Sequence, residues 1–307
     1  MQITNYEGKD LEQVEKFLQA HPTLAQATVK ELLKTCNLSF VLEGINRWQS
    51  TMICELKDSY VQQSQRYVTL SDDGYTLPQL KDEDKQKAEE LIGRAFALYA
   101  DMSQLKESFR GRPKKEHYLH GIPVEDARYI LPLAVKTNLS VATTGDKLLD
   151  WFHMMNRPLD RQMFADIHDA LLALLPPTIG QWLDKQDYTY EETGMLNQYY
   201  QDDLDNISAQ KPVVLLRTFA EPELKAGLGA LTSTKAEPPS AVLAQWGGAA
   251  AEKAKGVTTR VLGYGHTSIA EQCRTTFGMM FSLVTYHQQV RHRLPSTFRE
   301  PWLNILL

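Results

Sequence analysis

The stretch YHQQVRHRLPS at residues 286–296 decides how the rest of the chain is interpreted. Apolar residues at helical spacing lead into it, namely Phe277, Met280, Phe281 and Val284. A helix dipole favours cations at the helix C-terminus by about 0.3–1 kcal/mol each, which explains one arginine of the Arg-His-Arg run at 291–293. Adjacent side chains leave a helix in different directions, so the whole run needs several anionic partners. A diphosphate, or a reduced flavin ring with its negative charge, would supply them.

A second polar stretch, SYVQQSQRYV at residues 59–68, contains no proline or glycine and leads into a β-prone segment, Tyr67–Leu70. In an extended backbone Ser64 and Arg66 point to the same face, where a hydroxyl and a guanidinium can hold a phosphate. The alternative is a solvated edge strand that binds nothing.

A third stretch, GYGHTSIAE at residues 263–271, is typical of a turn that runs into a helix. Thr267 or Ser268 is expected as the N-cap, and Ser268 and Glu271 have the spacing of a capping box. Capping alone would explain these residues, but an exposed helix N-terminus also binds the phosphate or carbonyl groups of a cofactor.

The composition is that of a soluble globular protein, with 43% hydrophobic and 23% charged residues and a net charge of −5 over 307 residues. This charge excludes a generally basic surface that coats nucleic acid, so an anion site must be a local cluster of arginine and lysine. The N-terminal segment lacks the pattern of a secretory signal, and no apolar run reaches the about 18 residues that cross a membrane. Three cysteines without a CxxC pair indicate a reduced cytoplasm and argue against a thiolate metal site.

The organisation of the chain follows from its periodicity and from a repeat. Helical periodicity is strong over residues 10–18, 84–105, 147–155 and 161–175, and strand-like runs occur at 67–70 and 212–217. Residues 188–211 are typical of a connector, and we place a boundary near residue 206. Cys36–Phe40 aligns with Cys273–Phe277 across that boundary, which indicates an internal repeat. The sequence therefore predicts a first copy at 1–206 and a second, partial copy at 207–307.

Four phrases together resemble the signatures of the flavin-dependent thymidylate synthases. They are HQQVRHRLPS (287–296), SYVQQSQRYV (59–68), GHTSIAEQ (265–272) and EDARYILP (125–132). The resemblance implies an α+β fold, a core of antiparallel strands with long helices, present once nearly complete and once in part. It also implies an enzyme that methylates dUMP to dTMP, with FAD as cofactor and methylene-tetrahydrofolate and NADPH as co-substrates.

The resemblance assigns roles to individual residues. The flavin would be held by His266, Ser268, Glu271, Arg291, His292 and Arg293. The nucleotide dUMP would be bound by Gln63, Ser64, Gln65, Arg66, Arg128, Gln288 and Arg291, of which Arg128, Gln288 and Arg291 would serve catalysis. Its phosphate is expected on Ser64 and Arg66, and its base on Arg128 and Gln288. No metal ion, membrane or nucleic-acid polymer is expected as a partner.

Several positions depart from the family pattern. Cys54-Glu55-Leu56 stands where copy one would carry Arg-His-Arg, and Thr144-Gly145-Asp146 stands at a flavin-contacting Asn-x-Arg. The family's late substrate-binding arginine falls near Met155, with Arg157 as a possible substitute. Because family sites lie between subunits, we expect a homo-oligomer, either a dimer that imitates the tetramer or a tetramer. Three interpretations stay open: an active synthase, a flavin- or nucleotide-binding relative without activity, and a purely structural or interaction protein.

Overall fold

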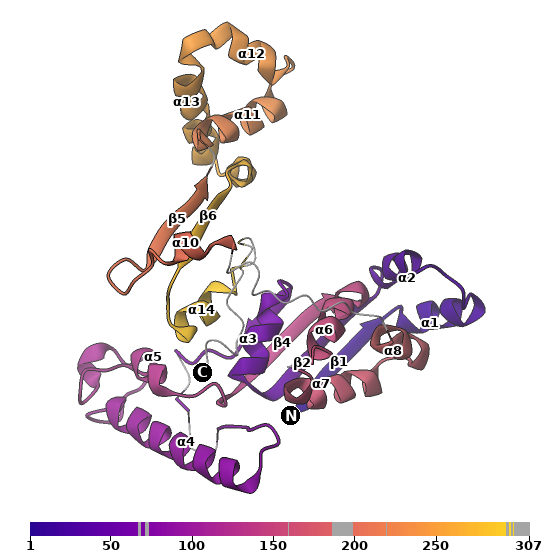
Figure 1. The fold of residues 1–307 in the computed structure, drawn as a ribbon, viewed down its shortest axis with the longest axis vertical. Coiled ribbons are helices and arrows are strands. Elements are labelled where there is room, and N and C mark those ends of the chain that lie inside the picture. Colours follow the sequence, from indigo (N-terminus) through magenta and orange to yellow (C-terminus); the bar gives the residue numbers. More distant parts are fainter. Residues whose placement is uncertain are drawn as a thin grey trace. The chain divides into compact units, whose positions relative to one another are not determined.

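The computed structural model describes residues 1–66, 69–70, 74–158, 160–185, 199–218, 220–292, 295 and 297. The chain forms two compact units, coloured along the sequence in Figure 1. The first unit contains Met1–Glu191 and Leu283–Arg299, and the second contains Glu192–Ser282 and Glu300–Leu307. Residues 192–282 of the second unit are thus inserted between the two segments of the first. The boundary predicted near residue 206 divides the chain into two sequence copies. It does not describe the compact units of the fold.

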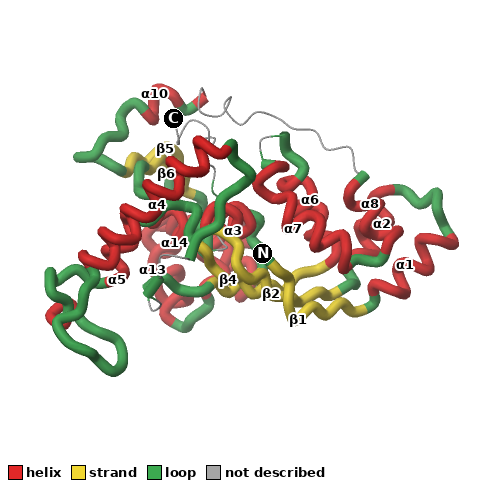
Figure 2. Tube along the Cα trace, turned by 90° about the horizontal axis from the view of Figure 1, so that it is seen from below, coloured by secondary structure: helices red, strands yellow, loops and turns green. Residues whose placement is uncertain are grey.

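A four-stranded antiparallel sheet is the centre of the first unit. Its strands are β1 (Gln2–Lys9), β2 (Asn37–Asn46), β3 (Ser59–Gln62) and β4 (Lys136–Thr144), in the order β1-β2-β4-β3. Along β4 buried and exposed residues alternate, so that Leu139 and Val141 face the core while Ser140 faces outward. Figure 2 shows helices α6, α7 and α8 on one side of this sheet.

The helices of the first unit follow the predicted periodicity. They are α1 (Leu11–Ala20), α2 (Gln26–Leu33), α3 (Arg47–Glu55), α4 (Asp82–Met102), α5 (Val124–Ala127), α6 (Leu148–Met155), α7 (Arg161–Leu174), α8 (Pro177–Asp184) and α14 (Leu283–Gln289). Short 3₁₀ segments are η1 (Lys115–His117), η2 (Arg128–Ile130) and η3 (Gly145–Lys147). The predicted helices at 10–18, 84–105, 147–155 and 161–175 are confirmed within a few residues.

Two local contacts fix helices that matter below. Glu15 of α1 accepts hydrogen bonds from the backbone N–H groups of Thr178 and Ile179, at 2.9 and 3.0 Å, and so caps the first turn of α8. Helix α4 packs Phe96 and Tyr99 against Ala127 and Leu131, which anchors the segment that carries Arg128. No helix among the described residues has the length and apolar character needed to cross a bilayer.

The second unit combines a two-stranded ribbon with helices. Its elements are α10 (Gln201–Leu204), β5 (Val213–Thr218), α11 (Pro222–Thr234), α12 (Pro239–Trp246), η4 (Gly247–Ala249), α13 (Ala250–Gly263), η5 (Thr267–Gln272) and β6 (Thr275–Met279). Strands β5 and β6 pair antiparallel. Helices α11 and α13 approach so closely at Gly227 that an added Cβ would lie 2.8 Å from the Cβ of Ala254.

The α+β class and the strand at 212–217 are confirmed, and three local predictions are wrong. The strand expected at 67–70 lies earlier, at β3, because Ser59–Gln62 finds a partner in β4; Thr69 and Leu70 are not in a strand, and Tyr67 and Val68 lie outside the described residues. Phe277 belongs to β6 instead of a helix. The cap position before η5 is His266 and makes no side-chain cap hydrogen bond, since this segment is a short 3₁₀ helix.

Candidate anion-binding site

A polar pocket lies in the first unit, between the start of α3, the end of β3 with the turn after it, η2, and α14. Its lining consists of Arg47, Gln62, Gln63, Gln65, Arg128, Val284, His287, Gln288 and Arg291. Helix α14 lies beside α3 despite the large sequence separation between them (Figure 1). Thr51 Oγ1 of α3 is 2.6 Å from His287 Nδ1 of α14. The structure therefore brings together predicted site residues from three distant stretches of the sequence.

The position of Arg47 is set by the start of α3. Asn46 and Gln49 form a reciprocal capping box, in which Gln49 N–H donates to Asn46 Oδ1 at 2.8 Å and Asn46 N–H donates to Gln49 Oε1 at 3.0 Å. The backbone N–H of Arg47 donates to Val135 O at 3.0 Å. These bonds hold the first turn of α3 against the sheet, and the Arg47 side chain is buried there with 3% exposure.

Gln62, at the end of β3, connects α14 to the sheet. Its Oε1 accepts hydrogen bonds from His287 Nε2 at 2.6 Å and from Arg291 Nη2 at 2.7 Å. Its Nε2 donates to Ser50 Oγ at 3.0 Å and to Thr137 Oγ1 at 3.3 Å. One amide thus orients both the imidazole and a guanidinium of the pocket.

The electrostatics of the pocket are those of concentrated positive charge. Burial, and then the charges of Arg128 and Arg291, lower the pKa of Arg47 to about 10. Burial, and then the charges of all three arginines, hold the pKa of His287 well below its ordinary 6.5, so this imidazole is neutral. Burial also lowers the pKa of Arg291. No ion pair joins Arg47 to a carboxylate within the part of the chain that the structure describes.

Two donors in the pocket are left unused. Arg291 Nε and Gln65 Nε2 are buried, and neither has a hydrogen-bond partner among the described residues. Buried donors are normally satisfied, because an unpaired one costs about 1–3 kcal/mol. Unused donors beside three guanidiniums suit an oxyanion, whose oxygens accept several hydrogen bonds at once.

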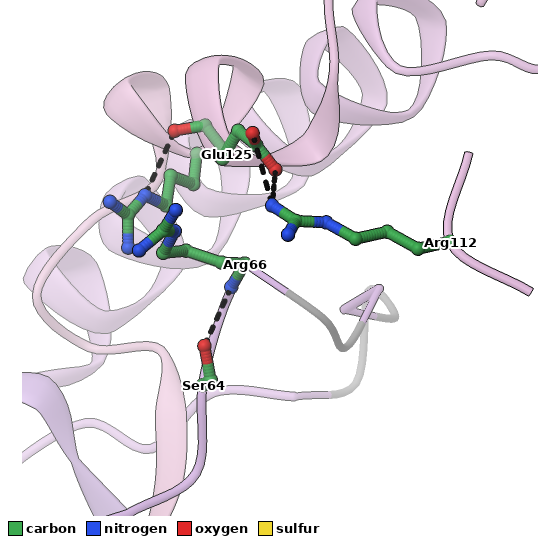
Figure 3. Close-up of polar contacts among 5 residues, drawn as sticks. Ser64, Arg66, Arg112 and Glu125 are labelled. Carbon is green, nitrogen blue, oxygen red and sulfur yellow. Dashed lines mark hydrogen bonds and ion pairs between the residues drawn. The ribbon is translucent and has the colours of Figure 1, made fainter. Parts of the chain in front are cut away.

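Ser64 and Arg66 lie beside the pocket and do not line it. The expectation that they share one face of an extended strand is wrong, because Gln65 and Arg66 form a turn and the N–H of Arg66 donates to Ser64 Oγ at 3.2 Å. Figure 3 shows the side chain of Arg66 extending toward the helical segment that carries Glu125. Arg112 forms an ion pair with Glu125, in which Arg112 Nη2 lies 3.2 Å from Glu125 Oε2.

Arg128 connects this neighbourhood with the pocket. Its Nε donates to the backbone carbonyl of Glu125 at 2.9 Å, which fixes the guanidinium at the pocket wall. Burial lowers the pKa of Arg128, and among the charges around it that of Arg66 lowers it as well. Arg66 is therefore close enough to add to the positive potential from outside.

The residues expected to hold a flavin do not all line the pocket. Arg291 lines it, whereas His292 is exposed and Arg293 lies outside the described residues. His266, Ser268 and Glu271 belong to the second unit, where all three are exposed at η5. In kind, the guanidinium of Arg291 fits an anionic diphosphate or reduced ring, and its unused Nε offers a donor to it.

Three polar residues of the pocket were not predicted as site residues from the sequence, namely Arg47, Gln62 and His287. Gln62 and His287 stand within the two quoted polar stretches, so their neighbours pointed to them. Arg47 had no such signal. The suggested substitute Arg157 does not line the pocket; it is 41% exposed and pairs with Asp160 at 3.8 Å, while Met155 is buried.

Buried guanidiniums, glutamine amides and an imidazole around one pocket have the chemistry that suits a small anionic ligand, such as one with a phosphate group. A family model described as thymidylate synthase complementing protein matches residues 3–170 and 215–300, and the chain belongs to this family. The resemblance drawn from the four sequence phrases is confirmed.

Curated relatives named flavin-dependent thymidylate synthase match parts of the chain. The protein of Geobacter sulfurreducens is 30% identical over 124 residues, which cover 40% of this chain and 49% of that protein. That of Clostridium tetani is 30% identical over 154 residues, covering 47% and 60%. The chain thus spans about half the length of the curated relatives it matches. A crystal structure of Thymidylate Synthase X from Helicobacter pylori with FAD and dUMP has a TM-score of 0.41 and 14% identity, covering 61% of this chain and all of that one.

Proposed function

We propose that the chain is a flavin-dependent thymidylate synthase that binds dUMP in the cationic pocket and uses FAD, NADPH and methylene-tetrahydrofolate. The observation that carries the proposal is that the guanidiniums of Arg47, Arg128 and Arg291 line one pocket, where Arg291 Nε and Gln65 Nε2 have no hydrogen-bond partner among the described residues. Such a pocket is complete only with an anion in it. Support comes also from the family and from the names of the curated relatives.

In this proposal the protein positions its ligands and supplies electrostatic stabilisation. Arg128, Gln288 and Arg291 contact the nucleotide, and Arg291 with His292 and Arg293 contacts the flavin, together with His266, Ser268 and Glu271. When bound there, a reduced flavin would supply the hydride that completes the methyl group. Cys54 is buried with 2% exposure and does not line the pocket, which speaks against a covalent bond between this thiol and the uracil.

One observation favours binding without turnover. At the position of the family's flavin-contacting Asn-x-Arg, Thr144 Oγ1 donates to Asp146 Oδ1 at 2.5 Å, and Asp146 is buried. A Cβ on Gly145 would lie 2.9 Å from Leu33 O, so this segment is packed tightly against α2. It presents an acid where the resemblance expects a cation, which weakens the hold on an anionic flavin.

The test is a flavin spectrum of the purified protein, followed by calorimetry with dUMP and deoxyuridine. We expect FAD absorbance that NADPH bleaches, dUMP binding that depends on its phosphate, and formation of dTMP on addition of methylene-tetrahydrofolate. Binding of both ligands without dTMP would favour the inactive relative. Absence of both FAD and dUMP binding would refute the proposal.

We also propose a homo-oligomer, since the flavin residues are divided between the two units and the family builds its sites between chains. Light scattering at micromolar concentration should give a dimeric or tetrameric mass. A monomer that nevertheless forms dTMP would show that one chain is sufficient for the site.

A further inference from the structure

We propose that Lys57 is a positioning residue for Arg291. Its ammonium group binds the backbone carbonyls of the two residues on either side of Arg291, and so holds the end of α14 at the wall of the pocket. The inference rests on the proposed function, in which Arg291 contacts both the nucleotide and the flavin. It adds a residue that lies outside all four sequence phrases.

Lys57 reaches the end of α14 from the turn between α3 and β3. Its Nζ donates to Val290 O and to His292 O, at 3.3 Å each. The last carbonyls of a helix have no partner further along the helix, and the helix dipole places partial negative charge on them. An ammonium group satisfies these carbonyls and is attracted to that charge, which explains why a further cation lies so close to a cationic pocket.

A second contact joins the same turn region to α14. Glu55 Oε1 accepts a hydrogen bond from Tyr286 Oη at 2.7 Å, so α14 is held within the helix and beyond its end. The Lys57 side chain is half-buried; burial lowers the pKa of Lys57, and the charge of Glu55 opposes that shift. Cys54-Glu55-Leu56 stands where copy one would carry Arg-His-Arg. In place of that motif, Glu55 and Lys57 support the segment that carries it in copy two.

The backbone conformation of Lys57 is uncommon for a lysine. Its φ is 56°, in the left-handed region that glycine adopts without strain. The N–H of Lys57 donates to Cys54 O at 3.4 Å, where α3 ends. Glycine would form this turn more easily, so a lysine held there indicates that its side chain has a use.

Lys57 and Gln62 act on different parts of Arg291. Gln62 Oε1 accepts from Arg291 Nη2 at 2.7 Å and orients the guanidinium. Lys57 fixes the main chain from which that guanidinium extends. Because a displacement of about 1 Å is enough to weaken a well-aligned contact, both supports are needed to place Arg291 against a ligand.

The test compares Lys57→Met, Lys57→Gly and Lys57→Arg, with Lys16→Met on the exposed side of α1 as the matched control. Flavin fluorescence measures the affinity for FAD, and calorimetry measures that for dUMP. Lys57→Met and Lys57→Gly should weaken both ligands roughly three- to tenfold, less than the loss of a direct charged contact. Lys57→Arg keeps a charged donor and should restore most of the affinity, while Lys16→Met should change neither ligand. Glycine keeps the turn without strain, so Lys57→Gly isolates the ammonium group in a folded protein.

A double-mutant cycle shows whether Lys57 acts through Arg291. In an Arg291→Gln background, Lys57→Met should weaken FAD by less than about twofold, because the side chain that Lys57 positions is already gone. The same fold-change in both backgrounds would show that the lysine acts elsewhere and would overturn the inference. Wild-type affinities in Lys57→Gly would overturn it too, since the turn alone would then be sufficient.

Hydrogen exchange of the ligand-free proteins tests the contact without any ligand. The backbone amides of residues 283–292 should exchange faster in Lys57→Met and Lys57→Gly than in the wild type, whereas those of α7 should not change. Equal protection of residues 283–292 in all variants would overturn the inference. A wild type that binds neither FAD nor dUMP would refute the proposed function. Faster exchange in the two Lys57 variants would then still show that this lysine holds the segment of Arg291.

Discussion

Gln62→Leu should weaken the attachment of α14 to the sheet. The substitution keeps the volume of the side chain but removes its hydrogen bonds. In the native protein Gln62 Oε1 accepts two hydrogen bonds, from the buried His287 and from the charged Arg291, at 2.6 and 2.7 Å. Leucine accepts neither. His287 Nε2–H would be left buried without an acceptor, and Arg291 would lose its bond to Gln62.

The size of the effect follows from these two bonds. A buried donor left unpaired costs about 1–3 kcal/mol, and a hydrogen bond to a charged group contributes about 1.5–3 kcal/mol. The two losses share one acceptor and are not additive, so we expect the free energy of unfolding to fall by about 2–4 kcal/mol. The hydroxyl of Ser50 still has an acceptor in the carbonyl of Arg47 at 3.1 Å, which limits the damage on that side.

Urea unfolding of the wild type, Gln62→Leu and Gln63→Leu is the appropriate assay. Gln63 is the matched control because its described contact to β4 is a backbone hydrogen bond to Asn138 O at 2.9 Å, which the substitution preserves. Gln63→Leu should change the free energy of unfolding by less than about 1 kcal/mol. A Gln62→Leu loss as small as that of the control would refute the idea that this amide holds α14 in place.

Three further predictions concern pH and packing. The folded-state pKa of His287 lies below the ordinary 6.5, so the unfolded chain gains a proton first as the pH falls. The free energy of unfolding should therefore decrease below about pH 6.5, by up to about 1.4 kcal/mol per pH unit from this group. The difference between the pH dependences of wild type and His287→Gln unfolding should show that slope, and parallel curves would contradict it. Glu15→Ala should lower the free energy of unfolding by about 1–2 kcal/mol through loss of the α8 cap, against little change in the exposed Glu12→Ala, as thermal unfolding can measure. Gly227→Ala should destabilise the second unit by about 1–3 kcal/mol, because the new Cβ would lie 2.8 Å from the Cβ of Ala254. Gly256→Ala, at a position of α13 with free space around it, should stabilise the same unit by about 0.5–1 kcal/mol. Equal shifts of the melting temperature in the two variants would count against this packing.

The helices were predictable because their apolar spacing is local, and the long strands were not. β2 pairs with β4, as in the contact of Leu42 with Leu139, so its strand character depends on a partner almost a hundred residues away. Ser39 and Ser140 on the outer face add little apolar contrast to the alternation. The polar N-terminal strand β1 gives still less indication of its pairing.

The pocket was predicted in part for a comparable reason. Arg128, Gln288 and Arg291 stand in phrases with unusual chemical content, so sequence alone could single them out. Arg47 stands at the first position of a helix, where the helix dipole disfavours a cation. Nothing in the neighbouring sequence indicates that its side chain is buried. Its role arises from the packing of η2 and α14 around the start of α3, which involves segments from three parts of the chain.

The insertion of the second unit into the first has a consequence for biosynthesis. A ribosome makes Thr51 and Gln62 early but makes their partners His287 and Arg291 only after residues 192–282 of the second unit. Until then the pocket of the nascent first unit lacks the side chains of α14. The surface that α14 later covers stays exposed to water and to chaperones. The pocket can therefore close only after residues 283–291 have been made. A break anywhere in residues 199–282 would turn this closure from an intramolecular step into the reassembly of two fragments.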